Sequence, residues 1–162
     1  MKRPKLYLET TIPSYLAAKP SRDIIVLAHQ QITTEWWETS RKRYSIFISP
    51  VVLEEIRSGD VSVAKKRLDL VKDLPQLDVS KQMESLAKGY IKKLNIPNKS
   101  YRDAFHLAIS VVHKMDILLT WNCGHLANEN IRKKLREIND DLGMTTPAIC
   151  TPEELVERKE DE

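Results

Sequence analysis

Hydrophobic and polar residues along the chain form short apolar runs separated by longer segments with helical spacing. The apolar runs predict five strands, at residues 5–8, 45–49, 77–79, 117–120 and 147–150. The segments between and after them predict helices that start near residues 13, 21, 50, 60, 80, 101, 128 and 152. Strands that alternate with helices predict an α/β sandwich with a mainly parallel sheet, and we expect residues 1–162 to form a single domain.

Polar residues that suit the first position of a helix precede several of the predicted helices. The expected capping residues are Ser21, Ser49, Asp60 and Ser80. The segment Thr151-Pro152-Glu153-Glu154 has the spacing of a capping box. In the helix after Ser21, helical spacing predicts one apolar face, made of Ile25, Ala28, Ile32 and Trp36.

Composition narrows the class of protein. The chain has 162 residues, of which 41% are hydrophobic, and a net charge of +3, so it can bury a core and tolerates a polyanionic partner without requiring one. Two cysteines make no disulfide framework, and Cys123-x-His125 lacks the second ligand pair of a zinc site. The N-terminal segment lacks the apolar stretch of a signal peptide, and no window is long enough to span a membrane. We therefore expect a soluble, cytoplasmic protein.

Acidic residues fall where a parallel sheet gathers its ligands. Glu9 ends the first predicted strand, and ligands bind outside the carboxyl ends of such strands. Three later segments could bring polar groups to the same place, through Glu54 or Glu55, Asp103, and Asn122. Converging carboxylates repel one another unless they bind a hard cation such as Mg²⁺ or Mn²⁺. An acid at a strand end or in a first helical turn is, however, more often a helix cap or a partner of the helix dipole than a metal ligand.

Four motifs in this order resemble one protein family. The segments YLETTIPSYL, ISPVVLEEIRSGD, YRDAFHLAIS and DILLTWNCGHLAN, with the Trp36-Trp37 pair, resemble PIN-domain proteins of the VapC-like toxin group of type II toxin–antitoxin systems. The resemblance covers nearly the whole chain. It implies a three-layer sandwich with a five-stranded, mainly parallel sheet flanked by helices. It also implies a Mg²⁺- or Mn²⁺-dependent ribonuclease, that is, a hydrolase of RNA phosphodiester bonds.

The resemblance also assigns the site residue by residue. The catalytic positions of the family fall on Glu9, Glu55, Asp103 and Asn122, and the metal ligands among them are Glu9, Glu55 and Asp103. Two positions depart from the family pattern. Asp is commonest at the first position, so Glu9 places its carboxylate one methylene further out. Asn122 offers a neutral oxygen where the family has an acid, which should weaken a second metal site.

Four further residues are expected to hold the ligands or contact the substrate. They are Thr10, Thr120, His106 and His125. Thr10 can hold the Glu9 carboxylate by a hydrogen bond. His106, one helical turn after Asp103, could contact a phosphate, or it could be a half-buried histidine bonded to the backbone. The same two interpretations apply to His125.

The expected partners follow from the same resemblance. They are an RNA substrate, a small antitoxin protein, and a second copy of the chain paired through helices, because exposing Trp36-Trp37 would be unfavourable. The basic runs 41–43 and 132–136 are solvated faces or follow an RNA backbone. One other function remains open, a catalytically weak PIN scaffold that binds RNA or a protein partner. A phosphotransferase or phosphatase with an acidic nucleophile after the first strand would need Asp in place of Glu9 and an Asp-x-Asp pattern, and neither is present.

Overall fold

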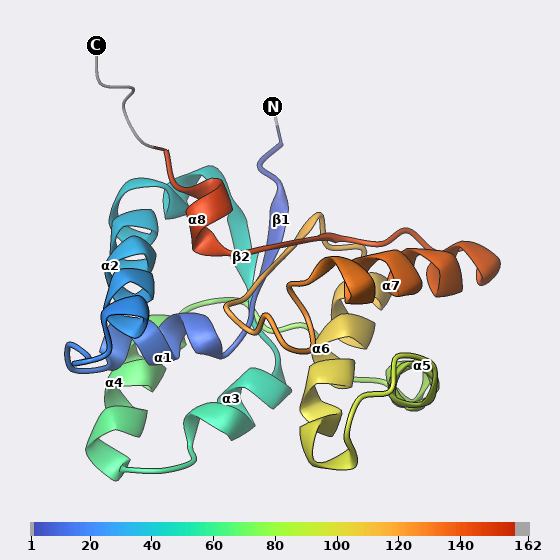
Figure 1. The fold of residues 1–162 in the computed structure, drawn as a ribbon, viewed down its shortest axis with the longest axis horizontal. Helices are drawn as coiled ribbons and strands as arrows, with labels where there is room; N and C mark the ends of the chain where they lie inside the picture. The colour runs from blue at the N-terminus through green and yellow to red at the C-terminus, as the bar shows by residue number, and fades with distance from the viewer. Residues whose placement is uncertain (1, 158–162) are drawn as a thin grey trace.

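The strands form one parallel sheet between two groups of helices. The structure, a computed structural model, describes residues 2–157. Its sheet has the order β2-β1-β3-β4, with β1 at Lys5–Leu8, β2 at Ser45–Phe47, β3 at Ile117–Leu119 and β4 at Ala148–Cys150. All three strand pairs are parallel. In Figure 1, α1, α2 and α4 lie on one side of the strands, and α5, α6 and α7 lie on the other.

The helices begin close to where the sequence predicts them. Their bounds are α1 Thr11–Ala17, α2 Ile24–Thr39, α3 Pro50–Ile56, α4 Val61–Val71, α5 Lys81–Lys93, α6 Tyr101–Val112, α7 Glu129–Asp141 and α8 Pro152–Leu155. Ser49, Asp60 and Ser80 each accept a hydrogen bond from a backbone N–H in the first turn, as predicted. The predicted capping box at Thr151 is also present. Local hydrogen bonding by short polar side chains therefore fixes these helix starts.

The predicted strand at residues 77–79 is wrong, so the sheet has four strands and not five. In its place, the chain makes a single bridge between Ile48 and Gln76, one residue before the predicted strand. Two backbone bonds hold it, from Ile48 N to Pro75 O at 3.0 Å and from Leu77 N to Ile48 O at 2.7 Å. The next carbonyl, that of Asp78, lies 2.9 Å from His113 Nε2 instead of facing β2. The segment thus leaves the sheet edge after one pairing and passes to the end of α6.

The expected start of α2 is wrong, and its expected buried face is right only in its second half. Asp23, not Ser21, caps the helix, by accepting bonds from two backbone N–H groups. Trp36 is buried and Ile32 packs against the core, as predicted, but Ile25 and Ala28 are exposed.

Two polar residues, Gln30 and Thr33, complete the buried face of α2. Gln30 bonds the backbone of the preceding loop, and Thr33 Oγ1 accepts from the Trp121 indole at 2.7 Å. Polar residues with such partners can be buried, so a hydrophobic pattern alone misses them.

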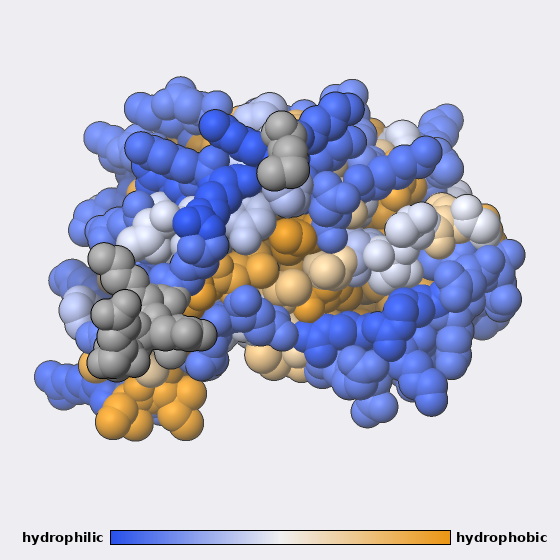
Figure 2. Space-filling model, turned by 90° about the horizontal axis from the view of Figure 1, so that it is seen from above, coloured by the Kyte–Doolittle hydropathy of each residue, from blue (hydrophilic) through white to orange (hydrophobic). Residues whose placement is uncertain are grey.

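The core lies on both faces of the sheet. Leu6, Tyr7 and Leu8 of β1 and Leu118 and Leu119 of β3 are fully buried, as expected for the central strands of a parallel sheet. Figure 2 views the molecule from above Figure 1, toward the side where β1 begins, and shows a band of hydrophobic residues within a mostly hydrophilic surface. The candidate site lies at the opposite, carboxyl edge of the strands.

Two further findings concern surfaces. Trp36 is fully buried within the chain, and Trp37 is half-buried with the Arg41 guanidinium 4.5 Å from its ring centre. The argument that exposed tryptophans require a dimer is therefore wrong for Trp36. None of the helices within residues 2–157 combines the length and the apolar character needed to cross a membrane.

Candidate metal centre

Glu9 follows β1 directly and carries its carboxylate at the carboxyl edge of the sheet. The residue is 3% exposed. Its Oε1 atom accepts three hydrogen bonds, from the Thr11 N–H at 3.0 Å, the Thr11 hydroxyl at 2.5 Å and the Thr120 hydroxyl at 2.8 Å. Its Oε2 atom has no hydrogen-bond partner within residues 2–157. One oxygen is thus fixed by the protein, and the other is free to bind a ligand.

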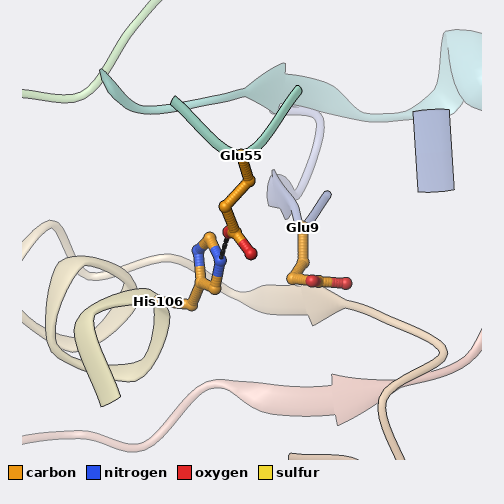
Figure 3. Close-up of side chains that lie close together, drawn as sticks. All are labelled: Glu9, Glu55 and His106. Atoms are coloured by element: carbon orange, nitrogen blue, oxygen red, sulfur yellow. Dashed lines mark hydrogen bonds and ion pairs between the residues drawn. The ribbon is translucent and has the colours of Figure 1, made fainter. Parts of the chain in front are cut away.

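Glu55 presents a second carboxylate of the same kind. It projects from α3, which follows β2 and starts at the Ser49 cap. Its Oε1 atom accepts from the Thr10 hydroxyl at 3.0 Å and lies 2.5 Å from His106 Nε2. Figure 3 marks the contact between Glu55 and His106 with a dashed line. No described residue bonds its Oε2 atom. The prediction that Thr10 bonds the Glu9 carboxylate is therefore wrong, because Thr10 bonds Glu55.

Glu54 points elsewhere, although it neighbours Glu55 in the sequence. Its side chain is 60% exposed and lies 2.5 Å from the Arg102 guanidinium, whereas the Glu55 side chain is 25% exposed. Adjacent residues on a helix are about 100° apart, so only one of the two can face the cluster. Glu55 is the one that does.

His106 is fully buried beneath the two carboxylates. Its Nε2 atom meets Glu55, and its Nδ1 atom lies 2.6 Å from the Tyr7 hydroxyl, which in turn lies 2.8 Å from the Ser49 hydroxyl. Its ring therefore bonds side chains, in contrast to a half-buried histidine bonded to the backbone. Carboxylate or imidazole atoms of Glu9, Glu55 and His106 all lie within 4.8 Å of one another (Figure 3), which makes this trio a possible metal site.

Asp103 lies outside this trio among the described residues, although its charge helps to raise the pKa of His106. The Asp103 carboxylate lies 2.8 Å from His125 Nδ1. Asn122 Oδ1 accepts the His125 backbone N–H at 3.0 Å, and the Asn122 N–H donates to Thr120 Oγ1 at 3.0 Å. Because Thr120 also binds Glu9, the loop after β3 connects the Glu9 carboxylate to the Asp103–His125 pair.

Burial and charge shift the pKa values of the trio in different directions. Burial raises the pKa of Glu9, and the nearby His106 and the threonine hydrogen bonds only partly offset this. Burial also acts to raise the pKa of Glu55, but the His106 hydrogen bond and charge outweigh it, so the net shift is downward. For His106, burial acts to lower the pKa, and the Glu55 hydrogen bond with the surrounding carboxylates raises it overall. These shifts favour an ionised Glu55 beside a protonated His106, whereas burial disfavours the ionised form of Glu9.

Two arginines line the same cleft and were missed by sequence reasoning. The cleft has a volume of about 370 Å³ and includes Glu9, Glu55, Arg67 and Arg102 in its walls. Arg67 Nη1 donates to the carbonyls of Ile56 and Ser58, at the end of α3. Arg102 precedes Asp103 in the motif YRDAFHLAIS, so its place in the sequence offered a signal; Arg67 comes from α4, outside every motif.

We expect Tyr7→Phe to destabilise the protein, because it leaves His106 Nδ1 and the Ser49 hydroxyl without their buried partner. The expected loss is about 1–3 kcal/mol in the free energy of unfolding, measured by urea denaturation in chelator. Tyr44→Phe is the matched control, since no hydrogen bond of its hydroxyl is found within residues 2–157, and it should change stability by less than about 0.5 kcal/mol. Equal effects of the two substitutions would contradict a structural role for the Tyr7 hydroxyl.

Comparison with solved structures places this arrangement in a known fold. A chain of the crystal structure of VapBC2 from Rickettsia felis, bound to a DNA fragment from its promoter, matches with a TM-score of 0.55 and 16% identity over 90% of this chain and 97% of that one. VapC20 from Mycobacterium tuberculosis, a Sarcin-Ricin loop cleaving toxin, matches with a TM-score of 0.57 and 12% identity over 74% of this chain and 92% of that one. The chain has a PIN-like α/β fold, similar to that of these two toxins. No protein-family model and no curated protein sequence matches the chain.

A divalent cation fits the donor set at the carboxyl edge. Hard cations prefer oxygen ligands, and Glu9 and Glu55 each keep one carboxylate oxygen without a hydrogen bond from the described residues. The other oxygen of each is oriented by threonine hydroxyls, which is how residues behind a metal site usually position its ligands. An imidazole already bonded on both nitrogens, as in His106, is less suited to act as a third ligand.

Proposed function

We propose that the protein is a Mg²⁺- or Mn²⁺-dependent endoribonuclease of PIN type and the toxin of a toxin–antitoxin pair. The observation that carries the proposal is the pair of glutamates, Glu9 and Glu55, each with one oxygen held and one free, at the carboxyl edge of a parallel sheet. This edge is where ligands bind in such sheets. The likeness to VapC20, which cleaves the Sarcin-Ricin loop, supports RNA as the substrate class.

In this proposal, each residue of the site has a separate role. Glu9 and Glu55 hold the cation, with Asp103 as the third carboxylate and Asn122 as an auxiliary ligand or water-positioning group. When bound, the ion supplies positive charge for the phosphate and lowers the pKa of a water that attacks phosphorus. Thr10, Thr11 and Thr120 orient the two glutamates. His106 fixes Glu55, and His125 fixes Asp103.

A second function, an RNA- or protein-binding PIN scaffold with weak catalysis, is favoured by one observation. Asp103 is already paired with His125, and Asn122 Oδ1 already accepts a backbone hydrogen bond. Among the described residues, only Glu9 and Glu55 bring an unbonded carboxylate oxygen to the trio, because Asp103, whose Oδ1 also has no hydrogen-bond partner there, lies outside it. Weak metal binding would leave the fold and the RNA surface intact while slowing the reaction.

The deciding experiment is cleavage of single-stranded RNA by the purified protein with Mg²⁺ or Mn²⁺ and with a chelator. The proposal expects cleavage with either metal and none in chelator, with activity restored when metal is added back. Because a contaminating nuclease would behave similarly, Glu9→Gln protein purified in parallel is the control. RNA binding without metal-dependent cleavage would select the scaffold function, and activity that persists in chelator would remove the metal mechanism.

The proposed partners and location need separate tests. The likeness to VapBC2 supports a small antitoxin, which we expect to be encoded by an adjacent reading frame, to co-purify with this chain and to suppress cleavage. We also propose that the protein is cytoplasmic and forms a homodimer, although the buried Trp36 no longer argues for the dimer. Light scattering that finds only an 18.7 kDa species at micromolar concentration would contradict the dimer.

A further inference from the structure

A second pocket adjoins the acidic cleft and has a different chemistry. It has a volume of about 250 Å³ and lies between α3 and α6, which are neighbours at the lower edge of Figure 1. Val51, Val79, Tyr101 and Phe105 supply apolar surface to its lining. Glu54 and Arg102 line both this pocket and the acidic cleft, so the two hollows share a wall. The two hollows are therefore adjacent, and a ligand that crosses the Glu54–Arg102 pair would reach both.

Aromatic rings in this pocket are available to a ligand. Tyr101 is 39% exposed, and its ring meets Phe105 edge to face, with 6.2 Å between ring centres. Val79 beside it is 37% exposed. An exposed aromatic and an exposed valine in one hollow are apolar surface that the fold leaves uncovered. Flat rings of this kind bind planar partners by stacking.

Arg102 gives the shared wall a positive charge. Its guanidinium lies 4.9 Å from the centre of the Tyr101 ring, and its Nη2 atom contacts Glu54. Its buried Nε atom has no hydrogen-bond partner within residues 2–157. A guanidinium has five N–H donors, so Arg102 can donate a hydrogen bond to a phosphate oxygen while it keeps its contact with Glu54. The pocket thus combines a stacking surface with an anion contact on the side of the carboxylates.

We propose that this pocket, here called the Tyr101 pocket and made of Val51, Val79, Tyr101 and Phe105 with Arg102 at its rim, binds one unpaired base of the RNA next to the phosphate that is cleaved. The inference rests on the proposed function. A base and its phosphate match the paired apolar and cationic surfaces. An antitoxin helix fits less well, because one helical turn with side chains fills on the order of 500 Å³.

Fluorescence of 2-aminopurine tests base binding without requiring cleavage. The probe is a single-stranded hexaribonucleotide with 2-aminopurine placed at each position in turn, added to Glu9→Gln protein with Mg²⁺. We expect strong quenching at one position and roughly 10-fold weaker binding when Tyr101→Leu is added, with recovery in Tyr101→Phe. Tyr44→Leu, at an aromatic residue far from the cleft, should leave the quenching unchanged. If quenching is the same in the Tyr101→Leu variant as in the protein with Tyr101, the proposal that this pocket binds a base is wrong.

Cleavage kinetics separate this inference from the proposed function. In the active protein, which keeps Glu9, Tyr101→Leu should raise KM for RNA about 10-fold, with a smaller change in kcat. It should also make cleavage less selective for the RNA sequence. If RNA is cleaved but Tyr101→Leu changes neither KM nor the cleavage sequence, base binding in the Tyr101 pocket is refuted and the proposed function stands. If quenching depends on Tyr101 but no RNA is cleaved, the proposed ribonuclease function is refuted and base binding in the Tyr101 pocket stands. If Tyr101→Leu abolishes a dimer without changing RNA binding, the pocket is an interface between copies and the inference is overturned.

Discussion

Glu9→Gln and Glu55→Gln should each lower metal-dependent RNA cleavage by about 100- to 1000-fold. A metal ion contributes several kcal/mol to stabilising the transition state, and each 1.4 kcal/mol corresponds to a factor of ten in rate. Glutamine keeps the shape of each side chain and one oxygen acceptor for the threonine hydrogen bonds. It removes the charge that attracts the cation, so the loss should reflect metal binding and not misfolding.

Comparison with two further variants sharpens this result. Asp103→Asn should also reduce cleavage, but by less than either glutamine substitution, because the structure places Asp103 outside the trio and against His125. Glu137→Gln, on the exposed surface of α7, is the matched control and should retain full activity. Initial rates over a range of Mn²⁺ concentrations provide the measurement. If the Glu9 and Glu55 variants cleave at the wild-type rate, these glutamates are structural and the proposed reaction is wrong.

Without metal, Glu9→Gln should make the folded protein more stable, in contrast to its effect on activity. Glu9 is almost fully buried, and an ionised carboxylate loses hydration there. All three hydrogen bonds to its side chain go to Oε1, so the glutamine carbonyl can accept them. We therefore expect the variant to melt about 3 °C or more above wild type at pH 7.5 in chelator, a shift typical of about 1 kcal/mol in a chain of this size.

The difference between the two proteins should depend on pH. Burial raises the pKa of Glu9 in the folded state above its ordinary value of 4.5. A group with a raised folded-state pKa stabilises the fold when protonated, and this contribution is lost as the pH rises through the folded-state pKa. The advantage of Glu9→Gln should therefore be small below pH 4.5 and grow as the pH rises above it. Because the charge of Glu9 also helps to raise the pKa of His106, Glu9→Gln should weaken that upward shift as well.

Thermal melts with Mn²⁺ complete the test. Mn²⁺ should raise the melting temperature of wild type, because a ligand that binds only the folded state stabilises it by mass action. It should raise that of Glu9→Gln much less. If Glu9→Gln is less stable than wild type in chelator and both respond equally to Mn²⁺, then Glu9 is a structural acid that the fold requires, and the metal site lies elsewhere.

Local chemistry in the sequence determined where the elements begin and where the first acid lies. Apolar runs located β1, β2 and β3, and single polar residues such as Ser49, Asp60 and Ser80 located helix starts, because a cap bonds backbone groups two or three residues away. Glu9 was placed at a strand end by its position alone. These features depend on neighbours in sequence, so periodicity and residue type suffice to predict them.

Contacts between distant segments decided the rest, and no local pattern encodes them. Whether Glu54 or Glu55 joins the trio depends on the packing of α3 against α6. There His106 pairs with Glu55, and Arg102 pairs with Glu54. The strand expected at residues 77–79 is reduced to one bridge because the Asp78 carbonyl meets His113. Polar partners from other elements likewise bury Thr33 and bring Arg67 to the cleft wall. Such choices depend on hydrogen bonds that form only when the helices and the sheet have assembled.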